Sequence, residues 1–180
     1  PRLVALMTAT ELFYEAVPRP RFVALETLRE KRTGYAADER SSVDLLQQEF
    51  PHVDFSDLSV HGEDIPKGED NDAVRARACA FLEGPLTNME EEAVALVTHK
   101  GWLRELRGTL KGFFDEGLLR VDFDVHKWDQ TLYKNAEIRV ATCGWEGDQL
   151  TSIVSRSVDN ALGSVVHEAC KPIIEKIAKQ

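Results

Sequence analysis

His99 is the residue of this chain whose type and position most clearly suggest chemistry. It lies in the sequence Val97-Thr98-His99-Lys100-Gly101, after an apolar run at 93–97 that predicts a buried strand. A helical pattern of apolar residues starts at Trp102. Open α/β sheets bind ligands between a strand and the next helix, where the N–H groups of the helix N-terminus favour an anion. His99 is therefore predicted to bind an anionic ligand; the alternative is a histidine in a tight turn, satisfied by the backbone.

Two basic residues after His99 are candidates for the same site. Lys100 and Arg104 lie at the start of the predicted helix, where their charges would attract an anion. The alternative for both is a solvated position on the helix face. Further basic residues lie between Arg19 and Arg40, and we expect most of them to pair with the acidic segment at 63–72 rather than to line a phosphate site.

The sequence predicts a site that uses neither a metal nor a cofactor. His99, His126 and Cys143 are too far apart in the sequence to form the closely spaced ligand pairs typical of structural zinc sites. The chain also carries no P-loop and no dinucleotide-binding fingerprint.

Composition limits the classes of partner. The formal net charge of −9 argues against general affinity for nucleic acid or for acidic membrane surfaces, because both are polyanions. No apolar stretch in the sequence is long enough to span a bilayer. The 3 cysteines are widely separated and include no C-x-x-C motif, which favours free thiols in a reducing compartment. We therefore expect a cytoplasmic protein.

Alternating strand and helix patterns predict an α/β fold. Helical patterns cover 3–16, 43–49, 73–86 and 100–114, and strand patterns cover 22–25, 93–97 and 137–142. Ser41 or Ser42 is expected to cap the second of these helices, and Asn71 or Asp72 the third. A long amphipathic pattern at 150–179 predicts a C-terminal helix that packs on the core or on a partner helix.

Several short motifs occur in an order that resembles one known family. They are Ala5-Leu6-Met7-Thr8-Ala9-Thr10, Leu28-Arg29-Glu30, Asp38-Glu39-Arg40, Phe50-Pro51-x-x-Asp54-Phe55-Ser56, Arg77-Ala78-x-Ala80-Phe81-Leu82, Val97-Thr98-His99-x-Gly101-Trp102-Leu103-Arg104 and Asn135-Ala136-Glu137-Ile138-Arg139. Together they resemble the histidine phosphatase superfamily, and in particular its phosphoglycerate-mutase-like branch. The resemblance runs from Pro1 to about Thr142.

The resemblance implies a fold, a mechanism and two catalytic residues. The fold would be a three-layer α/β/α sandwich with a mostly parallel central sheet. In the family, a histidine attacks a phosphoryl group, a carboxylic acid protonates the leaving oxygen, and water then hydrolyses the phosphohistidine. Glu30 matches the acid, and His99 matches the second histidine, which stabilises the phosphoryl oxygens. The partner would be a phosphorylated small molecule or a phosphoprotein.

Two departures from the family pattern concern the phosphoryl pocket. The family's nucleophile lies in an Arg-His-Gly motif on the first strand, and this motif does not occur in the 180 residues. We therefore expect an N-terminally truncated domain that lacks the strand with this motif. Val4 stands where the resemblance implies a phosphate-binding arginine, and Arg2 is the nearest candidate to replace it.

These observations predict two segments and leave two functions open. A histidine-phosphatase-like domain is expected at 1–145, followed by a C-terminal amphipathic helical extension at 146–180 that offers a route to self-association. The first function is phosphomonoester hydrolysis in a complete form, with this chain inactive alone. The alternative is a non-catalytic relative that binds a phosphorylated ligand or a protein. The predicted site consists of the catalytic Glu30 and His99 and the substrate-binding Arg2, Lys100 and Arg104.

Overall fold

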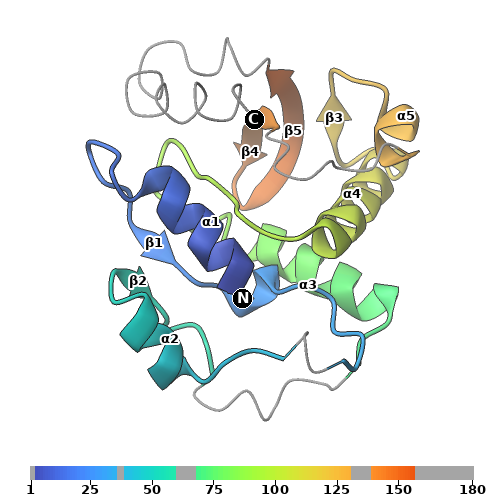
Figure 1. Cartoon of the computed structure of the whole chain (residues 1–180). Coiled ribbons are helices and arrows are strands. Elements are labelled where there is room, and N and C mark those ends of the chain that lie inside the picture. Colours follow the sequence, from blue (N-terminus) through green and yellow to red (C-terminus); the bar gives the residue numbers. More distant parts are fainter. Residues whose placement is uncertain (1–2, 36–38, 60–67, 131–138, 157–180) are drawn as a thin grey trace.

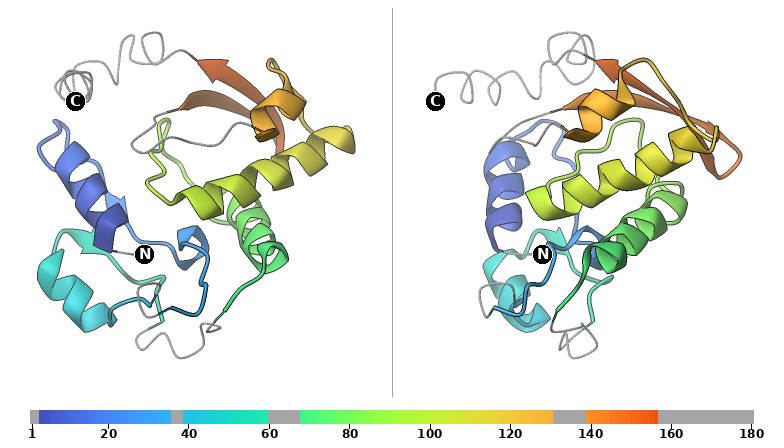
Figure 2. Two further views of the ribbon diagram at one scale, coloured as in Figure 1. Left: turned by 45° about the vertical axis from the view of Figure 1, so that its right-hand side comes forward. Right: turned by 90° about the vertical axis from the view of Figure 1, so that its right-hand side faces the viewer.

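The computed structural model describes residues 3–35, 39–59, 68–130 and 139–156. Its elements, in chain order, are α1 (Leu3–Phe13), β1 (Phe22–Val23), the 3-10 helix η1 (Glu26–Leu28), α2 (Val43–Glu49), β2 (Val53–Asp54), α3 (Asn71–Glu83), α4 (Lys100–Asp115), β3 (Arg120–Val121), α5 (Val125–Gln130), β4 (Val140–Glu146) and β5 (Gln149–Arg156). Figure 1 shows α1 and α2 with β1 and β2 on one side of the molecule, and α3, α4 and α5 with the other strands on the opposite side. The two views in Figure 2 show the same division.

The α/β class predicted from the sequence is confirmed, although the described strands form two small sheets rather than one continuous central sheet. In the first sheet β1 pairs in parallel with β2, so that Phe22 lies beside Val53. In the second the order is β3-β5-β4, with β3 parallel and β4 antiparallel to β5. Gly147, at φ 59°, makes the turn between β4 and β5, a backbone region that glycine enters without steric cost.

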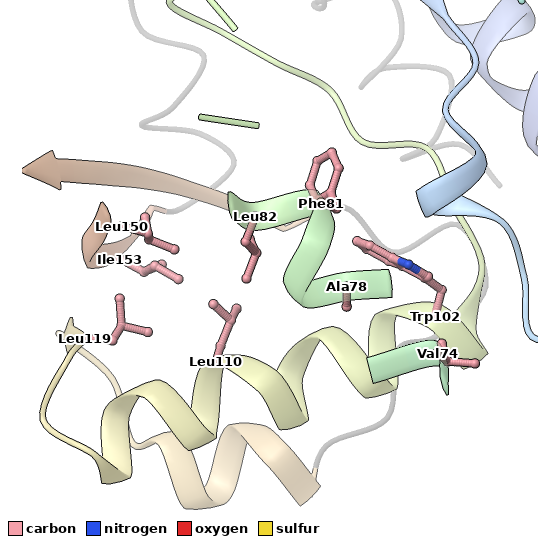
Figure 3. Close-up of a cluster of buried hydrophobic side chains, with 9 residues drawn as sticks. All are labelled: Val74, Ala78, Phe81, Leu82, Trp102, Leu110, Leu119, Leu150 and Ile153. Atoms are coloured by element: carbon pink, nitrogen blue, oxygen red, sulfur yellow. The ribbon is translucent and has the colours of Figure 1, made fainter. Parts of the chain in front are cut away.

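Each side of the molecule has its own cluster of buried apolar side chains. The first joins α1, β1, α2 and β2 through Leu6, Ala24, Leu46, Phe50, Val53, Phe55 and Leu58. The second packs α3 against α4 and β5, and Figure 3 shows its members converging between these elements: Val74, Ala78, Phe81, Leu82, Trp102, Leu110, Leu119, Leu150 and Ile153. Phe81 and Trp102 are both fully buried and meet edge to face, with ring centroids 5.7 Å apart. This contact fixes the start of α4 against α3.

The predicted helices of the first half of the chain are confirmed. Helix α2 has the predicted bounds, and the Ser42 side chain accepts a hydrogen bond from the N–H of Leu45 (3.4 Å) at its N-terminus. Helix α3 begins two residues earlier than expected, because Asp70, rather than Asn71 or Asp72, accepts the capping bond from Ala73 N–H (2.8 Å).

The predicted strand at 93–97 is wrong in this structure. Residues 93–99 have no regular secondary structure, residues 93–95 are exposed, and Val94 is 42% exposed. An apolar run becomes a strand only when a neighbouring strand supplies hydrogen-bond partners, and none of the described strands pairs with this segment. Figure 1 accordingly shows a plain tube leading into α4.

The C-terminal part also differs from the helical expectation. Residues 149–156 form β5 instead of the start of a long helix. Thr151, Ile153 and Val154 are β-branched and favour a strand, and β4 supplies a full antiparallel ladder beside them. The predicted strand at 137–142 is found as β4, which begins at Val140. The remainder of the predicted extension, at 157–180, lies outside the described residues. No helix among the described residues is long and apolar enough to cross a membrane.

Candidate functional site

Glu30 and His99, predicted from separate motifs, both lie at the N-terminus of α4: His99 is the residue before the helix, and Glu30 lies against its second residue, Gly101. Glu30 lies two residues after η1, and a Cβ atom at position 101 would lie only 2.4 Å from its Oε1 and 3.2 Å from its Cδ. The carboxyl group therefore rests against the backbone of Gly101, in space that any other residue type would fill. Thr98 reinforces the contact, because its hydroxyl donates a hydrogen bond to the carbonyl of Leu28 (2.7 Å), 70 residues away.

The Glu30 carboxylate is held at the positive end of a helix. Its Oε1 accepts a hydrogen bond from the backbone N–H of Lys31 (2.8 Å), and its other neighbour is the first turn of the 16-residue helix α4. Helix N-termini favour negative charge. The residue is half-buried, and one oxygen of its carboxyl group is anchored by the Lys31 N–H.

His99 is the residue that begins α4. Its backbone is extended (φ −116°, ψ 156°), and its carbonyl accepts the hydrogen bond from Leu103 N–H (2.9 Å) that opens the helix. The imidazole makes no capping hydrogen bond. The residue is half-buried, and its Nε2 is buried. The His99 side chain therefore does not cap the helix that it precedes.

The predicted cationic residues differ in their contacts. Lys100 is exposed at the first position of α4. Arg104 lies one turn later, and its guanidinium donates to Oε1 of Glu105 (2.8 Å) and to Oδ1 of Asn71 (3.0 Å). Lys31 donates to the same Asn71 oxygen (2.7 Å). Arg104 thus shares the carboxylate of Glu105 with Arg75. Lys31 follows Glu30 in the chain, and Lys100 precedes Gly101, against which the Glu30 carboxyl group lies.

Arg2, which was predicted to bind substrate, lies outside the described residues. Val4, at the position where the resemblance implies an arginine, is on α1 with 65% of its surface exposed. Among the described residues, no group of three or more His, Cys, Asp or Glu side chains is arranged to hold a metal ion.

An ion-pair network centred on Glu69 surrounds the segment that carries Glu30. Arg29 donates to both oxygens of Glu69 (2.9 and 2.8 Å), and Arg77 does the same from α3 (2.8 and 3.1 Å). The backbone N–H of Arg32 adds a fifth bond (3.1 Å). For Arg29 this confirms the expectation that the basic segment pairs with the acidic one. Arg77 was not predicted as part of the site; its signal is its place beside the apolar stripe of α3, with a side chain that is only 17% exposed.

These contacts set the charge state of Glu69. Burial alone would raise the pKa of this carboxyl group. The hydrogen bonds from Arg29, Arg77 and the N–H of Arg32 outweigh burial and lower its pKa from 4.5 to about 2. Glu69 is therefore ionised at every physiological pH, and its side chain, 4% exposed, is a fixed anchor rather than a proton carrier.

Comparison with known proteins identifies the wider group. The family model described as "Histidine phosphatase superfamily (branch 1)" matches residues 5–165, a range that continues beyond the expected domain boundary at 145. A relative from Arabidopsis thaliana, described as a phosphoglycerate mutase-like protein, is 33% identical over 151 residues. The alignment covers 80% of this chain and 55% of that relative, so the chain spans about half the length of the protein it matches. No solved structure matches significantly.

Proposed function

Because this chain belongs to the histidine phosphatase superfamily, we propose that it carries part of an active site for phosphomonoester hydrolysis. In this proposal Glu30 is the general acid and His99 stabilises the transferred phosphoryl group. The ligand is a phosphorylated small molecule or a phosphoprotein. One observation supports these roles above all others: Glu30 lies against Gly101, within the turn that follows His99.

The proposed reaction has two steps. In the first, a histidine nitrogen attacks phosphorus, an N–P bond forms, the P–O bond to the leaving group breaks, and Glu30 gives its proton to the leaving oxygen. In the second, Glu30 takes a proton from water, the water oxygen attacks phosphorus, and the N–P bond breaks to release phosphate. The His99 ring and the N–H groups that open α4 would bind the equatorial oxygens, where the charge of the transferred phosphoryl group is spread.

The nucleophilic histidine is the part that residues 1–180 do not supply. The sequence contains no Arg-His-Gly motif, and the two other histidines that the structure describes, His52 and His126, do not lie at the residue before a helix as His99 does. His52, for example, contacts the rings of Tyr14 and Phe22 and bonds to Thr10 Oγ1 (3.0 Å). Residues 1–180 alone are therefore expected not to hydrolyse phosphomonoesters. An Arg-His-Gly strand from outside this segment would complete the site, and residues 93–97, with which none of the described strands pairs, would offer it backbone partners.

A non-catalytic relative that binds a phosphorylated ligand or a protein is the second candidate. It is favoured by Val4, an exposed apolar side chain where the family resemblance implies an arginine that binds phosphate. A binding module tolerates this change, whereas a phosphatase loses a charge that stabilises its transition state.

Sequencing the transcript that encodes residues 1–180 distinguishes the two functions. We expect the transcript to encode an in-frame strand ending in Arg-His-Gly, and we expect the longer product to hydrolyse p-nitrophenyl phosphate. His99→Ala should abolish that activity, and Glu30→Gln should lower kcat by roughly 10² to 10⁴-fold, the usual range for loss of a general acid. A transcript without such a strand would favour the binding function. Hydrolysis by residues 1–180 that disappears in His99→Ala would show that a missing nucleophile is the wrong explanation.

A further inference from the structure

The segment that delivers Glu30 to the site is irregular, yet the carbonyls of residues 27–30 are all hydrogen bonded. After η1 the chain at 29–33 has no helix or strand. Even so, all four carbonyls of residues 27–30 accept hydrogen bonds from side chains. The donors are Nη1 of Arg77 to Thr27 and to Arg29 (both 2.9 Å), Oγ1 of Thr98 to Leu28 (2.7 Å) and Nη1 of Arg29 to Glu30 (3.0 Å).

Arg77 is the centre of this arrangement. Its Nε and Nη2 bind the two oxygens of Glu69, while its Nη1 reaches the two carbonyls on either side of Leu28. Glu69 in turn holds the Arg29 side chain and the N–H of Arg32, and its own N–H donates to the Arg32 carbonyl (2.9 Å). The network therefore ties the chain before and after Glu30 to the N-terminal half of α3.

We propose that Arg77 and Glu69 are positioning residues, which fix the backbone around Glu30 so that its carboxylate lies against Gly101 beside His99. For its catalytic consequence this inference rests on the proposed function of Glu30. A general acid contributes fully only when it is held within about 0.5 Å of the productive position by side chains that are themselves fixed. The two bidentate guanidinium pairs on a buried carboxylate supply such a fixed frame.

The geometry of the guanidinium, and not its charge alone, carries this role. A lysine at position 77 would keep the positive charge near Glu69 but present a single nitrogen, which cannot span the carboxylate and the two carbonyls together. Arg75 provides a matched comparison on the same helix. It also pairs with a buried carboxylate, Oε2 of Glu105 (3.0 Å), yet no hydrogen bond connects it to residues 27–30 in the part of the chain that the structure describes.

The test uses residues 1–180 at pH 7 and follows the amide resonance of Gly101 by NMR. Glu30→Gln removes the carboxylate charge beside Gly101 and should move this resonance, and that movement is then measured with Glu30→Gln introduced into each of the variants below. In Arg77→Lys the movement should fall by about twofold or more, because the carboxylate is no longer held against Gly101. Arg75→Lys should leave it unchanged.

Several results would overturn the inference. An unmodified chain whose Gly101 resonance is insensitive to Glu30→Gln would refute the contact itself. An Arg77→Lys chain that keeps the full movement would refute the positioning role. If Arg77→Lys fails to fold, Thr98→Val decides, because it removes the Leu28 hydrogen bond without changing any charge; it should also reduce the movement, and an unchanged response would count against the proposal.

Binding of inorganic phosphate separates this inference from the proposed function. Titration with phosphate should shift the His99 ring signals of the unmodified chain, and this shift should weaken in Arg77→Lys. If phosphate leaves His99 unaffected while Gly101 still responds to Glu30, the proposed function fails and the positioning role stands. If phosphate binds equally to both chains and Gly101 responds equally in both, the positioning role fails and the proposed function stands.

Discussion

Replacing Glu69 with glutamine should destabilise this protein by an amount that depends strongly on pH. The substitution keeps the size of the side chain but removes the charge that two guanidinium groups share. It also places an amide NH2 against donor groups, where only an acceptor fits. Arg29, 4% exposed, retains Glu26 as a partner, whereas Arg77 loses the only carboxylate to which it is hydrogen bonded among the described residues.

The pKa of Glu69 gives the magnitude. Its ordinary value is 4.5 and its value in the folded protein is about 2, which corresponds to about 3 kcal/mol of stability at pH 7. Because the folded pKa is the lower one, this contribution is complete above the unfolded value and is lost as the pH falls through the folded value. At pH 3 only about 1.4 kcal/mol remains.

The measurement is urea unfolding of the unmodified chain and of Glu69→Gln at pH 7 and at pH 3. The difference in unfolding free energy between the two chains should be about 3 kcal/mol at pH 7 and smaller by about 2 kcal/mol at pH 3. Asp72→Asn, at an exposed position in the first turn of α3, is the control and should change stability by less than about 0.5 kcal/mol. A Glu69→Gln difference below about 1 kcal/mol at pH 7, or one that is equal at both pH values, would refute this reasoning.

Three further substitutions test other parts of the structure. Gly101→Ala should displace the Glu30 carboxylate, since the new Cβ would lie 2.4 Å from Oε1; the Lys31 amide resonance should shift, and an unchanged resonance would contradict the contact. Phe81→Ala, at a fully buried position, should lower the unfolding free energy by about 3 to 5 kcal/mol in urea, and a loss below about 1 kcal/mol would be inconsistent with its burial. Val94→Lys should change stability by less than about 0.5 kcal/mol because the residue is 42% exposed outside any strand; a loss of several times that size would indicate a buried, paired segment.

Local signals explain which parts of the fold could be predicted. The apolar spacing predicts α2 and α3, and the serine pair before α2 predicts its Ser42 cap, because a cap and a periodic stripe are both properties of a few neighbouring residues. The cap of α3 is Asp70 and not the predicted Asn71 or Asp72. The segment 93–97 has the composition of a strand, but pairing depends on a second strand that composition does not reveal. The same reason applies at 149–156, where β4 turned a helix-like apolar pattern into a strand.

The candidate site also has a part that the sequence predicts and a part that only the folded structure shows. Glu30 and His99 stand in motifs that a reader of the sequence can find, whereas the contact of Glu30 with Gly101 depends on residues 28–30 lying against the segment that begins α4. Arg77 illustrates the limit. An arginine beside an apolar stripe is normally a solvated residue, and only the folded chain shows that its guanidinium binds two carbonyls from a distant loop.

The hydrogen bond from Thr98 to Leu28 has a consequence for the order of folding. It joins residues 70 positions apart, and closing so long a loop costs entropy that local helix contacts do not. α3 and α4 are able to form early from neighbouring residues, whereas Glu30 meets Gly101 only after the two distant segments have docked. During synthesis on the ribosome, the segment that bears Glu30 leaves the exit tunnel long before its counterpart. The candidate site is thus assembled only once α4 has emerged, and a shorter nascent chain contains Glu30 without the turn that follows His99.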